Sequence, residues 1–150
     1  MRRSATASTA RGSIVHIGTA KAEIERLASS GSTITLVNEG VQPYALARRV
    51  EAPSPPWDRT AYDILIAIPI AYDLGTSLDG FYIGLPYTFR GGEHNRVNGQ
   101  VVVVGGSQWR AVSWHYPDGK QFRLGIDNIE SHIVHCRGFF LERGAVNART

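Results

Sequence analysis

This 150-residue chain lacks most of the features that assign a sequence quickly to a class of protein. Its single cysteine, Cys136, cannot form an internal disulfide, so we expect the protein in the reducing cytoplasm. No apolar run approaches the roughly 18 residues of a membrane-spanning helix. Gly91-Gly92 and Gly105-Gly106 fit neither a P-loop nor a dinucleotide-binding fingerprint, and no G-x-S-x-G elbow occurs. These absences argue against a nucleotide-binding enzyme, a membrane protein and a disulfide scaffold.

The excess of positive charge is confined to the start of the chain. The formal net charge is +3, and Arg2, Arg3 and Arg11 account for it, because the remaining residues include 13 basic and 13 acidic side chains. Without a basic stripe, nucleic acid is not an expected partner. Residues 1–18 are expected to form a flexible basic tail. Residues 19–150, with an ordinary balance of apolar and charged side chains, are expected to form one domain.

Helix signals lie at both ends of the expected domain. Thr19 can cap a short helix over Ala20–Ala28. Asp127, with Glu130 three residues later, has the pattern of a capping box and predicts a final helix over Asp127–Arg143. That helix has a buried stripe at helical spacing, formed by Ile126, Ile129, Ile133, Cys136 and Phe140.

Between the two helices, β-branched and aromatic runs bounded by glycine or proline predict antiparallel strands. They are Thr33–Val37, Leu46–Val50, Tyr62–Ile68, Phe81–Leu85, Val101–Val104 and Gln108–Trp114. Tyr62–Ile68 is almost entirely apolar, which predicts a central strand, and Asn98-Gly99 is typical of a hairpin turn. The sequence therefore predicts an α+β domain whose meander, Thr33–Leu85, is followed by a helix packed on one face of the sheet.

Ser113 and His115 are the strongest candidates for chemistry. If Gln108–His115 is a strand, its alternation places both side chains on one face and Trp114 on the other. An imidazole near a hydroxyl is the minimum requirement for activating a serine. Asp118 is the candidate for a third, orienting carboxylate. A purely structural role for both side chains stays open, because such catalytic groups are identified by geometry.

Cys136 and its histidine neighbours give weaker signals. Cys136 lies on the apolar stripe, far from the helix start that would stabilise a thiolate, so we expect a core residue. His132, His135 and Cys136 lack the four-ligand spacing of a structural zinc site. No metal or cofactor is therefore expected, and the two histidines are expected to contact solvent or to cap the helix.

Four motifs in fixed order carry a resemblance to a known family. They are I-P-x-x-Y (Ile68, Pro69, Tyr72), D-G-F-Y (Asp79–Tyr82), W-x-x-x-S-x-H (Trp109, Ser113, His115) and F-R-x-G-x-D-x-I (Phe122, Arg123, Gly125, Asp127, Ile129). Over residues 30–143 the chain resembles the bacterial ubiquitin-conjugating-enzyme-like (UBC-like) proteins of prokaryotic family E. The resemblance implies an N-terminal helix, an antiparallel meander and a C-terminal helix. It also implies a modification pathway with a ubiquitin-like protein, an activating enzyme and a JAB-type metallopeptidase.

Departures from ubiquitin-conjugating enzymes are as informative as the resemblance. Asp73 stands where those enzymes have the last proline of F-P-x-x-Y-P. No cysteine occurs in Val112–His115, where their thioester cysteine would fall, and no H-P-N motif is present. An ordinary thioester mechanism is thus excluded at that position. Two functions remain open: a carrier in which Ser113, activated by His115, accepts the ubiquitin-like protein as an oxyester, or an inactive scaffold that binds the ubiquitin-like protein or activating enzyme.

Overall fold

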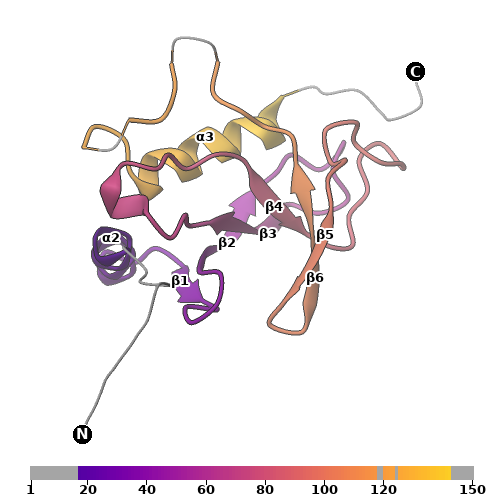
Figure 1. Cartoon of the computed structure of the whole chain (residues 1–150). Helices are drawn as coiled ribbons and strands as arrows, with labels where there is room; N and C mark the ends of the chain where they lie inside the picture. The colour runs from indigo at the N-terminus through magenta and orange to yellow at the C-terminus, as the bar shows by residue number, and fades with distance from the viewer. Residues whose placement is uncertain (1–16, 118–119, 124, 143–150) are drawn as a thin grey trace, which may run out of the picture.

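The computed structural model, which describes residues 17–117, 120–123 and 125–142, has one sheet with two helices packed against it (Figure 1). Its elements in chain order are α2 (Gly18–Ser29), β1 (Ile34–Val37), β2 (Tyr44–Glu51), β3 (Ala61–Ala67), the 3₁₀ turn η1 (Tyr72–Leu74), β4 (Phe81–Gly84), β5 (Val101–Val104), β6 (Ser107–Val112) and α3 (Ile129–Leu141). The α+β, UBC-like prediction is confirmed. Within these described ranges, no helix combines the length and apolar character needed to cross a membrane.

All six strands form one antiparallel sheet in the order β1-β2-β3-β4-β6-β5. The first four strands are the predicted meander. The hairpin of β5 and β6 turns at Gly105-Gly106 and joins the meander where β6 pairs with β4. In β3, Ile64 and Ile66 are buried toward one face of the sheet and Leu65 toward the other, which confirms the prediction of a central strand.

The helices cover one face of this sheet. Figure 1 shows α3 lying across the sheet and α2 beside β1. Ile24 and Leu27 of α2 and Phe139 and Phe140 of α3 are buried in the main core. Trp57, in the loop between β2 and β3, joins this core and donates a hydrogen bond from Nε1 to the Phe140 carbonyl at 3.2 Å. The opposite face carries a smaller apolar cluster made of strand residues: Tyr44, Leu46, Leu65 and Trp109.

The start of α2 differs from the prediction. Ile17 is the N-cap residue and makes no side-chain cap, and Thr19 lies inside the helix. The Thr19 N–H instead donates to both carboxylate oxygens of Asp73, at 3.0 and 3.1 Å. A carboxylate is favourable at a helix N-terminus, because unpaired N–H groups and the positive end of the helix dipole meet there. Asp73 therefore caps α2 from a position 54 residues away in the sequence.

The start of α3 is also shifted from the prediction. Asn128 is the N-cap residue, and it exchanges hydrogen bonds with Ser131 in a capping box. The Asp127 carboxylate instead accepts from the Arg123 N–H at 2.9 Å, in the turn before the helix. Asp127 and Glu130 were therefore the wrong capping pair. Ile126 lies before the helix and is 67% exposed, so its place in the buried stripe was also wrong.

Asn98-Gly99 does not form the predicted hairpin. The Gly99 N–H donates to the Ala111 carbonyl at 3.1 Å, which extends the pairing of β5 and β6. A Cβ atom at Gly99 would lie 2.5 Å from the Ala111 Cβ. The glycine is therefore required by the close approach of two chain segments, a cause that its dipeptide context does not reveal.

Candidate functional site

The residues that follow β6 alternate between α3 and the outer surface. Trp114 donates from Nε1 to the His135 carbonyl of α3 at 2.8 Å, and the Tyr116 hydroxyl contacts His132 of the same helix. Ser113 and His115 contact other loops instead. Although β6 ends at Val112, this segment separates the two pairs of side chains as the strand pattern predicted.

Ser113 is held by the loop before β5. Its Oγ donates to Asn98 Oδ1 at 2.8 Å, its N–H donates to the Arg96 carbonyl at 2.7 Å, and its carbonyl accepts from Arg96 Nη1 at 3.4 Å. A serine hydroxyl has one proton to donate. In this structure that proton is directed at Asn98 and not at His115.

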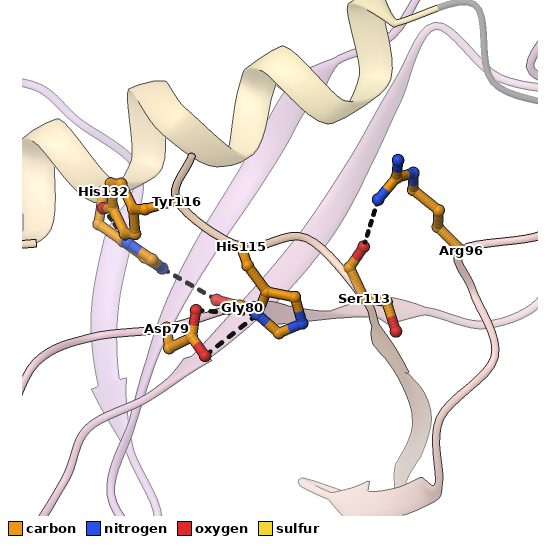
Figure 2. A network of polar contacts seen from close by, with 7 residues as sticks. All are labelled: Asp79, Gly80, Arg96, Ser113, His115, Tyr116 and His132. Carbon is orange, nitrogen blue, oxygen red and sulfur yellow. Dashed lines mark hydrogen bonds and ion pairs between the residues drawn. The ribbon is translucent and has the colours of Figure 1, made fainter. Parts of the chain in front are cut away.

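His115 is paired with Asp79. Its Nδ1 lies 3.1 Å from each carboxylate oxygen, and the two side chains are 64% and 59% exposed. In the view of Figure 2, the ring of His115 lies between Asp79 and Ser113. Asp118, the carboxylate suggested by the sequence, lies outside the described residues. Sequence reasoning missed Asp79, and its only available signal was the D-G-F-Y motif that this residue begins.

Inside the protein, close to the pair of Asp79 and His115, His132 of α3 is fully buried. Its Nε2 donates to the Gly80 carbonyl at 2.9 Å, and its Nδ1 accepts from the Tyr116 hydroxyl at 2.5 Å (Figure 2). Burial lowers the pKa of His132 to about 4, so the ring is neutral at pH 7. The expectation that His132 contacts solvent or caps the helix was wrong, because its two ring nitrogens are satisfied inside the protein.

Cys136 is a core residue, as the sequence predicted. It is fully buried, and burial raises the pKa of its thiol. A thiolate at this position would be costly, since the charged form loses its hydration. Across the described parts of the chain, no group of three or more His, Cys, Asp or Glu side chains is arranged to hold a metal ion.

Comparison with protein families finds a match over most of the chain. The family described as prokaryotic E2 family E matches residues 20–141, which span the sheet, most of α2, all of α3, and the segment with Ser113 and His115. No curated protein and no solved structure matches the chain.

Proposed function

The chain belongs to prokaryotic E2 family E, and on that premise we propose that Ser113 accepts the C-terminus of a ubiquitin-like protein as an oxyester. Membership makes it a UBC-like protein of ubiquitin-like modification, with a ubiquitin-like protein and an activating enzyme as partners in general. The oxyester is supported by one arrangement above all. A half-buried serine and an exposed, carboxylate-paired histidine lie just after the end of β6, whereas the only cysteine is buried. We expect the reaction in the cytoplasm, where the activating enzyme has ATP.

In the proposed step, Ser113 Oγ bonds to the carbonyl carbon of the activated C-terminus while its proton moves to His115 Nε2. The bond from that carbon to the thioester sulfur of the activating enzyme breaks, and the imidazolium returns the proton to this sulfur. Before attack, the Ser113 hydroxyl has to leave Asn98 Oδ1, because its single proton cannot be donated to both groups.

The test is incubation of this chain with its cognate activating enzyme and ubiquitin-like protein, ATP and Mg²⁺, followed by intact-mass spectrometry. We expect an adduct of one ubiquitin-like protein that hydroxylamine or mild base removes. Ser113→Ala should abolish the adduct while leaving noncovalent binding of the ubiquitin-like protein unchanged. Ser107→Ala, at the exposed start of β6, is the matched control and should form the adduct normally. Full adduct formation by Ser113→Ala would exclude the oxyester at this residue.

The second candidate is a catalytically inactive scaffold that binds the ubiquitin-like protein or the activating enzyme. The hydrogen bond from Ser113 to Asn98 favours it, since this contact satisfies the hydroxyl in a purely structural way. A wild-type protein that binds both partners, yet forms no adduct in the presence of ATP, would establish the scaffold in place of the carrier.

A further inference from the structure

We propose that Asp79 is a positioning residue, which holds His115 with Nε2 free to receive the proton of Ser113. We also assign to the buried residues Gly80 and His132 and the half-buried Tyr116 the role of a clamp, which keeps Asp79 and His115 in contact. The inference deepens the proposed function and rests on it, because it supplies the orientation that a general base at His115 requires.

The first step is the proton on His115. Both Asp79 oxygens lie 3.1 Å from Nδ1, and a carboxylate can only accept. In the neutral ring the proton therefore lies on Nδ1, and Nε2 keeps its lone pair. An imidazole in water without such a partner carries its proton mainly on Nε2. In that tautomer Nε2 has no lone pair with which to accept the proton of Ser113. The partner of one ring nitrogen thus decides the chemistry of the other.

The second step is the exposure of this pair. Because both side chains are more than half exposed, the contact between them contributes little to the stability of the fold. A contact of that kind needs support from the backbone on each side if it is to orient a catalytic group. The support has to come from the residues adjacent to Asp79 and His115.

The clamp provides that support. Gly80 follows Asp79, and Tyr116 follows His115, so each partner of the exposed pair has a neighbour bound to His132. Through its two ring nitrogens, His132 joins the segment that carries Asp79 to the segment that carries His115, although these two residues are 36 positions apart in the sequence. The Tyr116 ring also stacks on His135, with centroids 3.9 Å apart and an interplanar angle of 9°. Figure 2 shows His132 and Tyr116 on the side of α3 and the pair of Asp79 and His115 on the outer side.

The positioning role is tested with Asp79→Ala, which removes the carboxylate from an exposed position. Long-range ¹H–¹⁵N spectra of the histidine rings report which nitrogen of neutral His115 carries the proton. We expect Nδ1–H in the wild type and mainly Nε2–H in Asp79→Ala. Formation of the Ser113 adduct should slow by about 10–100-fold, below the loss caused by removing the base itself. Asp79→Glu should restore both properties in part, and Glu25→Ala, on the exposed side of α2, should change neither.

The clamp is tested separately with Tyr116→Phe, which keeps the ring stacked on His135 but removes the hydroxyl that contacts His132. We expect a mixture of His115 tautomers and a severalfold slower transfer. Wild-type values for both measurements would overturn the clamp.

An Nε2–H tautomer in the wild type, or an unchanged tautomer in Asp79→Ala, would overturn the positioning role. If the wild type forms no adduct but its tautomer follows Asp79 as expected, the proposed function fails while the positioning by Asp79 stands.

Discussion

His115 and His132 belong to one polar network, yet their surroundings are opposite. The His115 side chain is 64% exposed and paired with the Asp79 carboxylate, whereas His132 is fully buried and bound to a carbonyl and a phenol. An exposed imidazole can exchange protons with solvent and with an incoming acyl donor, while a buried neutral one has its nitrogens occupied. The same residue type therefore has one ring open to solvent and another whose two nitrogens hold chain segments together inside the protein.

The largest expected effect is on the outer histidine. His115→Ala should slow adduct formation about 10²–10⁴-fold, because the base is lost. The free energy of unfolding should change by no more than about 0.5 kcal/mol, since the side chain is exposed. Initial rates from intact-mass spectrometry and urea denaturation measure the two quantities. A variant that transfers at the wild-type rate would remove His115 from the chemistry.

The inner histidine should show the reverse pattern. His132→Ala should lower the free energy of unfolding by about 3–5 kcal/mol, because it leaves a cavity and deprives Gly80 and Tyr116 of a hydrogen-bond partner. Denaturant unfolding of His132→Ala and His115→Ala compares the loss in free energy of unfolding for the same substitution at a buried and at an exposed position. Equal losses of stability in the two variants would contradict a structural role that belongs to His132 and not to His115.

The burial of His132 should also make the stability of the protein depend on pH. Burial is the main cause that holds the pKa of His132 at about 4, against 6.5 for an ordinary histidine. Between these pH values the unfolded chain binds the proton more readily, so stability rises with pH. The contribution, roughly 3 kcal/mol, should be complete above pH 6.5 and lost as the pH falls through 4.

Unfolding experiments from pH 4 to pH 7 measure this dependence. The non-titrating variant His132→Gln should show a flatter dependence, with the remaining slope owed in part to His94, whose pKa burial also lowers to about 4. An identical slope in the variant and the wild type would contradict the assignment to His132.

The smallest expected effect concerns the buried thiol. Cys136→Ser should lower the free energy of unfolding by about 1–3 kcal/mol, because it places a hydroxyl in an apolar site. Adduct formation by the folded variant should stay at the wild-type level. If Cys136→Ser is as stable as the wild type and forms no adduct, the thiol and not Ser113 carries the chemistry.

Much of the fold was predictable, because it depends on patterns within single segments. The apolar run of Tyr62–Ile68 identified the central strand, and the runs Val101–Val104 and Gln108–Trp114 identified the two strands that pair as β5 and β6. The helix starts were predicted less well. Asp127 and Asn128 are adjacent, and both residue types are suited to an N-cap. Asn128 takes this position because the Asp127 carboxylate accepts a hydrogen bond from the Arg123 N–H in the turn before the helix.

The candidate site, like the fold, was predictable only in part. Alternation over a few residues was enough to place Ser113 and His115 apart from Trp114. The partner of His115 was not predictable, because nothing in the sequence around His115 points to a carboxylate 36 residues upstream. The same holds for Asp73, which caps α2 from η1.

The sequence by itself determined the α+β architecture, the buried position of Cys136, and the separation of Ser113 and His115 from their inward-facing neighbours. These properties follow from side-chain periodicity, which acts over a few residues of one element. Only the tertiary structure decided that Asp79 pairs with His115, that Asn98 holds Ser113, and that His132 is buried between two chain segments. Hydrogen bonds depend on distance in space, and the distance between remote residues is set only when the helices pack on the sheet.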